Sequence, residues 1–267
     1  MGILNVTPNS FSDGGLFLTE NQACQHAQIL IQQGVDIIDI GGESSKPGAE
    51  TVSVVEEIAR VIPVIERIRT FSDVCISIDT CKSEVMEAAV LAGASIINDI
   101  SALTGAGAIE TAAGLNVPVC LMHMQGVPKS MQDNPHYALD IIDEINCFFQ
   151  QRIDACLNAG IRRDNLILDP GFGYGKTVQH NLLIVKRLHE FKSHQLPLLL
   201  GVSRKSTIGT VLKKTVHQRL PGSIATAVYA ALHGVSIIRT HDVDETNQAL
   251  QMVHAISNIN NDEQGTV

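Results

Sequence analysis

The chain has 267 residues, of which 45% are hydrophobic and 18% are charged, a balance typical of a folded globular protein. Lysine and arginine number 19 against 28 aspartate and glutamate residues, so the formal net charge is −9. This charge disfavours partners such as nucleic acid or an anionic membrane surface, because both require a basic surface. No apolar run is long enough to cross a bilayer, and no signal-peptide pattern begins the sequence. We therefore expect a cytoplasmic protein without nucleic-acid or membrane partners.

Short apolar runs alternate with longer segments of helical periodicity along the whole chain. The runs are rich in Ile, Val and Leu without polar alternation, which predicts parallel strands covered on both faces at residues 2–6, 35–40, 74–78, 95–98, 117–122, 165–168, 197–202 and 235–239. The helical patterns cover residues 21–33, 54–69, 83–92, 138–159, 179–194, 219–233 and 244–259, and Pro63 is expected to kink or interrupt the second of them.

This alternation predicts an α/β protein with the architecture of a (β/α)8 TIM barrel, and a doubly wound open sheet is the alternative. No linker or composition shift divides the chain, so we expect one domain over residues 1–257, followed by a frayed polar tail at residues 258–267. The first expected strand begins at residue 2, so a leading segment that closes the bottom of the barrel is expected to be absent or shortened. Six cysteines without a C-x-x-C pair are expected to be reduced thiols.

Polar or ionisable residues follow every expected strand. In chain order they are Asn5, Asp39, Asp79, Asn98-Asp99, His123, Asp169, Ser203-Arg204-Lys205-Ser206 and Arg239-Thr240-His241. Because the C-terminal ends of barrel strands meet at one mouth, these side chains are expected to converge there. The preference of Asp and Asn for turns explains a single polar residue after a strand. Polar residues after all eight strands indicate a binding site instead.

The chemistry of these residues narrows the ligand. Two carboxylates and an amide suit the N–H and carbonyl edge of a flat heterocycle: Asp79, Asp169 and Asn98. Three donors suit anionic or carbonyl oxygen: Lys205, Arg239 and His241. A structural ion pair is the alternative for any one of them.

Other motifs are less informative. Glycine- and serine-rich segments at residues 7–18 and 41–50 are expected to close over the mouth, and ordinary surface loops are the alternative. The run Gly171-x-Gly173-x-Gly175-Lys176 lacks the spacing of a phosphate-binding loop and is given no role. His123 has no partner at metal-ligand spacing, so a zinc site is not expected. Asn5 suits a Mg²⁺ that keeps most of its waters. Ser206 is expected to start a short helix.

Motifs from all eight strand ends together resemble the dihydropteroate synthase family. They are MGILNVTPNSFSDGG (1–15), DIGGESSKPG (39–48), SIDT (77–80), INDI (97–100), LMHM (121–124), LDPGFG (168–173), GVSRKS (201–206) and RTH (239–241). The resemblance covers nearly the whole chain and implies a pterin-binding TIM barrel. It implies a transferase that joins 6-hydroxymethyl-7,8-dihydropterin diphosphate to 4-aminobenzoate with Mg²⁺, forming 7,8-dihydropteroate and pyrophosphate by diphosphate departure followed by amine attack. It further implies a homodimer formed through the last helices and inhibition by sulfonamides.

The resemblance also implies a role for each matching residue. The pterin would be bound by Asp79, Asn98, Met122, Asp169, Tyr174, Lys205 and Arg239, and catalysis would depend on Asp79, Lys205 and Arg239. The diphosphate would be bound by Asn5, Lys46, Arg239 and His241, with Asn5 as the metal ligand. The aminobenzoate would be bound by Phe11, Ser45, Pro47, Lys205 and Ser206.

The chain departs from the family pattern in the first two loops. Ser45 and Lys46 replace the usual Thr and Arg, and Asn9 replaces the usual Asp. Lys46 keeps the positive charge but loses the bidentate geometry of arginine, which predicts a weaker hold on the diphosphate. The alternatives are a catalytically impaired pterin-binding homologue, a pterin-dependent methyltransferase and, least favoured, Schiff-base chemistry at Lys205.

Overall fold

Strands and helices alternate throughout the residues that the computed structural model describes, which are 1–7, 20–44, 48 and 51–259. The strands are β1 (Gly2–Asn5), β2 (Ile37–Gly41), β3 (Cys75–Asp79), β4 (Ile96–Asp99), β5 (Val119–Met122), β6 (Leu166–Asp169), β7 (Leu199–Gly201) and β8 (Ile237–Arg239). The helices are α1 (Glu20–Gln32), α2 (Val54–Arg69), α3 (Ser83–Leu91), α4 (Ala108–Leu115), α5 (Ile141–Asn158), α6 (Val178–Lys186), α7 (Ser206–Leu212), α8 (Leu220–Leu232) and α9 (Val243–Ser257), with 3-10 helices η1 (Arg163–Asn165), η2 (Leu188–His194) and η3 (Val216–Gln218).

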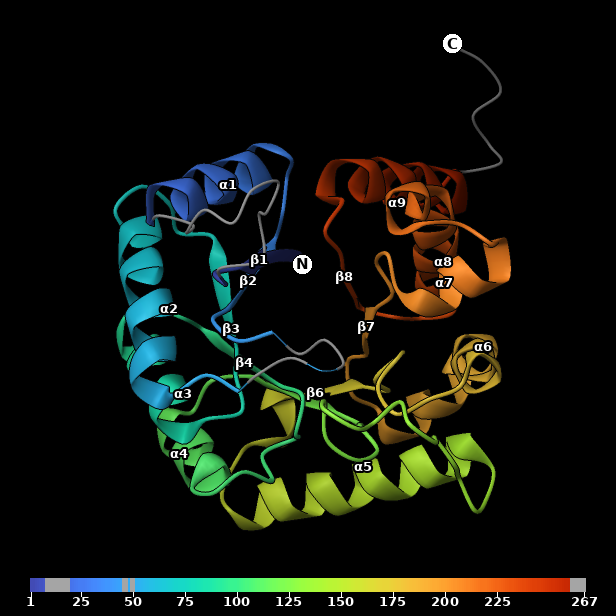
Figure 1. Ribbon diagram of the computed structural model, residues 1–267, viewed down its shortest axis with the longest axis horizontal. Coiled ribbons are helices and arrows are strands. Elements are labelled where there is room, and N and C mark those ends of the chain that lie inside the picture. The colour runs from blue at the N-terminus through green and yellow to red at the C-terminus, as the bar shows by residue number, and fades with distance from the viewer. Residues whose placement is uncertain (8–19, 45–47, 49–50, 260–267) are drawn as a thin grey trace.

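The strands close into a barrel. Strands β1 to β6 form one parallel sheet in chain order, and β7 pairs with β8. Parallel bridges from Gly2 to Thr240 and from Leu168 to Leu198 join the two sheets at both seams. The helices form an outer ring around the strands (Figure 1). The predicted TIM barrel is therefore confirmed, and the open doubly wound sheet is excluded.

Two apolar layers hold the barrel together. The larger one lies between the strands and the surrounding helices and includes Leu4, Ile38, Ile40 and Ile78, which are fully buried. The second is a small cluster inside the barrel, which we call the lower layer: Met1, Ile37, Cys120, Ile167, Leu199 and Ile237. All of its members except Met1 precede an inward-facing residue at a strand end by two positions, so the lower layer forms the floor beneath the mouth.

Three helix predictions needed correction. Helix α2 continues through Pro63 without interruption, because buried residues on both sides, Val61 and Ile65 among them, anchor its two halves to the barrel. The predicted helix over residues 179–194 is divided into α6 and η2 at Arg187, whose side chain bonds Asp140 and Glu190. Helix α4 was not predicted, because it has only eight residues, half of them alanine or glycine, which is too short for a clear period.

Two expectations from composition can be compared with the structure. All six cysteines are unpaired, as predicted. Among the described residues, no helix is both long enough and apolar enough to cross a membrane. The predicted fraying of the tail concerns residues 258–267, most of which lie outside the described ranges.

Candidate active site

Inward-facing polar side chains gather at the C-terminal ends of the strands, above the lower layer. Strand register places Asp79 opposite Asn98, Met122 opposite Asp169, and Gly201 opposite Arg239. Paired residues of parallel strands project to the same face, so these side chains share the barrel interior. The predicted convergence of polar strand-end residues is confirmed for Asp79, Asn98, Asp169 and Arg239. It is wrong for Asp99, which pairs with Leu121 on the opposite face of the sheet and accepts hydrogen bonds from the backbone that follows β4.

Arg239 is held between two carboxylates. Its Nε donates to Asp39 Oδ2 at 2.6 Å, and its Nη2 donates to Asp79 Oδ2 at 2.7 Å. Asp39 Oδ2 also accepts a hydrogen bond from Asn98 Nδ2 at 3.1 Å. Asp39 had been named only as a strand-end residue, without a role. Asp39 is two residues before Gly41, which pairs with Asp79 in the strand register, so its side chain projects to the same inner face as Asp79 and Asn98. This alternation is the sequence signal that could have predicted its position.

The Asp79 carboxyl group titrates far from its ordinary range. Burial raises the pKa of Asp79 to about 7, and the negative charges of Asp39, Asp99 and Glu57 act in the same direction. The positive charge of Arg239 opposes this rise without cancelling it. Near neutral pH, Asp79 is therefore poised between its neutral and ionised forms.

Lys205 crosses the mouth from the start of α7. Its ammonium group donates to the carbonyl oxygen of Phe172 and lies 4.4 Å from the centre of the Tyr174 ring. Burial lowers the pKa of Lys205 to about 8, although the nearby Asp169 carboxylate favours the charged form. Lys205 and Tyr174, both predicted to bind the same ligand, are therefore in contact.

Asp169 is fixed by the turn that follows β6. Its Oδ1 accepts a hydrogen bond from the Gly171 backbone at 2.7 Å, and burial raises its pKa. Gly171 has a φ of 68°, and a Cβ there would overlap the carbonyl oxygen of His123. Only glycine suits this conformation and close approach, so the turn requires glycine at this position.

Lys176 is buried, and its motif had been given no role from the sequence. Its amine lies 3.0 Å from His123 Nδ1 and donates to the carbonyl oxygens of His123 and Tyr174 at 3.2 and 3.0 Å. Burial lowers the pKa of Lys176 well below its usual value. Burial and the Lys176 charge likewise lower the pKa of His123 to about 2. Lys176 thus ties the Gly171–Gly175 turn to the end of β5, and His123 serves as its partner.

Three further predicted residues lie at the end of β1, at the start of α7 and just after β8, which form part of the rim of the mouth. His241 is exposed, and its Nδ1 lies 3.0 Å from the Ser203 hydroxyl, which also accepts a hydrogen bond from the His241 backbone at 3.2 Å. Ser206 is exposed and begins α7, as predicted. Asn5 is half-buried at the end of β1. Phe11, Ser45, Lys46 and Pro47 lie outside the described residues.

Comparison with known proteins places the chain in a family. A profile described as "Pterin binding enzyme" matches residues 1–241. The chain is 52% identical to dihydropteroate synthase from Escherichia coli strain K12, over 96% of this chain and 90% of the relative.

Two solved structures are similar in both sequence and fold. The dihydropteroate synthase of Yersinia pestis in complex with a sulfonamide drug has a TM-score of 0.93 and 50% identity, covering 97% of this chain and 94% of the other. The dihydropteroate synthase of Xanthomonas albilineans with 4-aminobenzoic acid has a TM-score of 0.91 and 45% identity, covering 97% and 93%. The chain belongs to the dihydropteroate synthases, within the family of pterin-binding enzymes.

Proposed function

We propose that this chain condenses 6-hydroxymethyl-7,8-dihydropterin diphosphate with 4-aminobenzoate, giving 7,8-dihydropteroate and pyrophosphate in folate biosynthesis. The observation that carries the proposal is the set of side chains at one mouth of the barrel: Asp79, Asn98, Asp169, Lys205 and Arg239. Family membership at 52% identity over nearly the whole chain supports the same reaction.

The carboxylates and amide would bind the pterin edge. A pterin ring presents guanidine-like N–H groups, and the buried Asp169 carboxylate is a suitable acceptor for them. Asn98 offers an amide from the adjacent strand position to Asp79. Met122, opposite Asp169 in the strand register, and Tyr174 would provide the apolar walls.

Breaking the bond between the pterin methylene carbon and the diphosphate oxygen leaves positive charge spread over the ring. The ionised Asp79 carboxylate would stabilise this charge electrostatically. Arg239, Lys46 and His241 would bind the departing diphosphate, which takes the bonding electron pair. The amine of 4-aminobenzoate would then attack the methylene carbon and lose a proton. The chain need not form a covalent bond to either substrate.

Lys205 and Ser206 would bind the aminobenzoate beside the pterin, with Phe11, Ser45 and Pro47 from the first two loops. Ser206 is exposed at the start of α7, where its hydroxyl can reach the aminobenzoate carboxylate. Sulfonamides that mimic 4-aminobenzoate should therefore compete with it. Steady-state kinetics without such competition would contradict a shared subsite.

Magnesium fits this mouth as a companion of the diphosphate. Among the described residues, no group of three or more His, Cys, Asp or Glu side chains forms a metal site, whereas Asn5 offers one amide oxygen. One or two protein oxygens together with substrate phosphate oxygens are the usual ligands of Mg²⁺. Bound there, Mg²⁺ would neutralise charge on the leaving diphosphate.

Pyrophosphate release tests the proposal directly. The protein is mixed with the pterin diphosphate and Mg²⁺, with and without 4-aminobenzoate, and both pyrophosphate and dihydropteroate are measured. The proposal expects both products to appear together. Tight pterin binding without product would instead identify a pterin-binding protein that lacks the synthase activity, and Lys46→Arg would test whether the altered loop is the reason.

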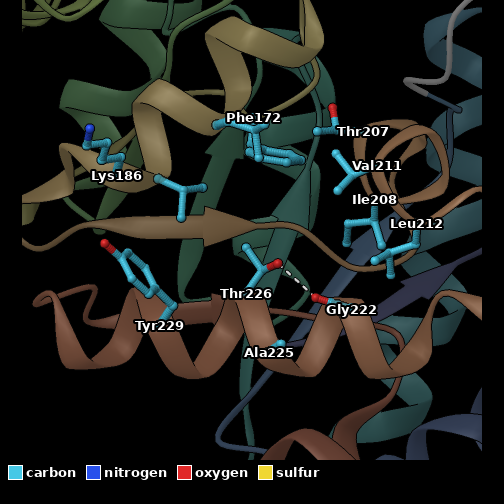
Figure 2. Close-up of a pocket in the computed structure, with 12 residues that line it drawn as sticks. Phe172, Lys186, Thr207, Ile208, Val211, Leu212, Gly222, Ala225, Thr226 and Tyr229 are labelled. Carbon is cyan, nitrogen blue, oxygen red and sulfur yellow. Dashed lines mark hydrogen bonds between the residues drawn. The ribbon is translucent and has the colours of Figure 1, made fainter.

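A homodimer formed through the last helices is part of the proposal. An apolar groove of about 370 Å³ lies between α6, α7 and α8 and is lined by Ile208, Val211, Leu212, Gly222 and Tyr229, among others (Figure 2). Val211, Leu212 and Tyr229 are 51%, 45% and 40% exposed. A second copy of this chain would cover them, which gives their exposure a physical reason.

Light scattering of the purified protein tests the dimer. Val211→Glu should convert it to a monomer, whereas Leu91→Glu, at a still more exposed apolar residue of α3, should leave the mass unchanged. A monomeric wild-type protein would contradict this part of the proposal. The six unpaired thiols support the further proposal of a reducing, cytoplasmic location, which fractionation of cells would test.

A further inference from the structure

We propose that Asp39 is a positioning residue of this enzyme, which sets the orientation of both Arg239 and Asn98 from beneath the substrate pocket. The inference rests on the proposed function, because it concerns how that pocket is held. Asp39 lies in the middle of β2 and is fully buried. It faces the barrel interior one step below Gly41, whose missing side chain leaves space beside Asp79 and Asn5.

The first step of the argument concerns Arg239. The guanidinium group donates through Nε to Asp39 and through Nη2 to Asp79, so two carboxylates from two strands fix its plane. The side chain of Arg239 is only 16% exposed, which means that this plane cannot turn freely in solvent. Asp79 lies at the mouth and is expected to face the ligand, whereas Asp39 has no solvent exposure. The hydrogen bond from Arg239 to Asp39 should therefore remain when Asp79 gains a proton or binds the ligand.

The second step concerns Asn98. An amide side chain presents a donor at one end and an acceptor at the other, and a 180° rotation exchanges them. Asn98 Nδ2 donates to Asp39 Oδ2 at 3.1 Å, and a carboxylate cannot donate in return when ionised. The contact therefore fixes the Asn98 amide with its nitrogen toward Asp39. Asp39 thus decides which polar atoms Asn98 presents to the pterin edge.

Both contacts converge on one oxygen of one buried carboxylate, Oδ2. A group buried this deeply cannot touch substrate, and yet it organises two residues that are expected to do so. The pattern resembles that of the residues that orient metal ligands, whose loss typically costs about 10- to 100-fold in affinity or activity, and we take the same range here.

The experiment uses Asp39→Asn, which keeps the shape and removes the charge. The matched control is Asp36→Asn, three residues earlier on an exposed position. We expect Asp39→Asn to lower kcat/KM for the pterin diphosphate by about 10- to 100-fold. Asp36→Asn should stay within about twofold, in line with an exposed surface site. Circular dichroism and thermal melting establish that both variants are folded.

A double-mutant cycle separates positioning from general damage. Arg239→Lys keeps the positive charge but removes the planar guanidinium, whose Nε and Nη2 bond Asp39 and Asp79 separately. If Asp39 acts through Arg239 as well as Asn98, Asp39→Asn should cost clearly less in the Arg239→Lys background than in the wild type, because only the Asn98 contact then remains to be lost. Losses that multiply, or an Asp39→Asn variant within threefold of wild type, would overturn the proposal. If Asp39→Asn does not fold, Asp39→Glu takes its place in the same cycle under the same two criteria.

The Asn98 branch is measured without turnover. Calorimetry with 6-hydroxymethylpterin should show a loss of affinity of about tenfold in Asp39→Asn and none in Asp36→Asn. Unchanged affinity would overturn the Asn98 branch. Because this measurement requires binding alone, it distinguishes failure of the positioning role from failure of the proposed reaction, which would appear as an inactive wild-type protein that still binds pterin.

Discussion

The same strands build two opposite environments inside the barrel, two residues apart. Strand β6 places Ile167 in the apolar lower layer and Asp169 in the pocket above it, and β8 does the same with Ile237 and Arg239. Strand β2 follows with Ile37 below Asp39. Successive inward-facing residues on one strand thus change from floor to site in a rise of about 7 Å.

The two environments depend on each other. The lower layer excludes water from beneath the pocket, and burial is the main reason that the pKa values of Asp79 and Asp169 are raised and that of Lys205 is lowered. The charged side chains in turn lie above this layer, in the pocket. The floor should therefore control stability, and the pocket should control ligand affinity and pH dependence.

Breaking the floor should have the largest effect. Ile167→Ala removes a buried side chain of the lower layer and leaves a cavity, which typically costs about 2–5 kcal/mol in unfolding free energy. Denaturant unfolding measures the loss, and Ile167→Val is the matched control, expected to cost about 0.5–1.5 kcal/mol. Pterin affinity of the folded Ile167→Ala protein should remain within a few-fold. Equal stability of the two variants would show that the floor is not tightly packed.

The opposite result is expected two residues later. Asp169→Asn removes the buried charge expected to pair with the pterin N–H groups, and should weaken pterin binding by about 100-fold. Isothermal titration calorimetry with 6-hydroxymethylpterin measures it, and Asp164→Asn, an exposed carboxylate in the turn before β6, is the control. The unfolding free energy should change less than in Ile167→Ala. Unchanged pterin affinity would exclude Asp169 as the pterin acceptor.

The raised and lowered pKa values predict a narrow pH optimum. Asp79, with a pKa of about 7, must lose its proton to stabilise positive charge, so kcat/KM should rise with pH through about 7. Lys205, with a pKa of about 8, must keep its proton, so kcat/KM should fall above about 8. Each limb should approach about tenfold per pH unit. Lys205→Arg should remove the basic limb, and a profile that stays flat from pH 6 to 9 would contradict both assignments.

The barrel itself could be predicted from the sequence because its signals are local. Runs of Ile, Val and Leu predict strands that lie within two residues of those in the structure at nearly every end. The strand ends also predicted that Asp79, Asn98, Asp169 and Arg239 converge, but not that Asp99 faces outward and bonds the backbone after β4. Local patterns did not predict helix α4, which is only eight residues long. Nor did they predict the division of the helix at Arg187, whose side chain bonds the distant Asp140.

The partners within the site could not be predicted in the same way. Arg239 bonds Asp39 and Asp79, which are 200 and 160 residues away in the chain, and no spacing rule predicts such a pair. The role of Lys176 could not be predicted because its partner, His123, follows β5 and lies 53 residues away in the chain. Binding roles for Phe11, Ser45, Lys46 and Pro47 remain predictions from the resemblance alone.

The smallest effect is expected at the rim, where solvent reaches the pocket. Ser203 is buried, and its hydroxyl contacts both the backbone N–H and the Nδ1 of His241, thereby fixing the orientation of an exposed ring that is expected to bind diphosphate. Ser203→Ala removes hydrogen bonds worth about 1 kcal/mol, so kcat/KM for the pterin diphosphate should fall by about fivefold while affinity for the bare pterin is unchanged. Ser193→Ala, at an exposed hydroxyl that bonds only the Glu190 carbonyl oxygen, is the control. If kcat/KM for the pterin diphosphate and affinity for the bare pterin fell equally, Ser203 would support the pterin pocket as well as His241. The exposed rim and the buried pocket would then be structurally coupled.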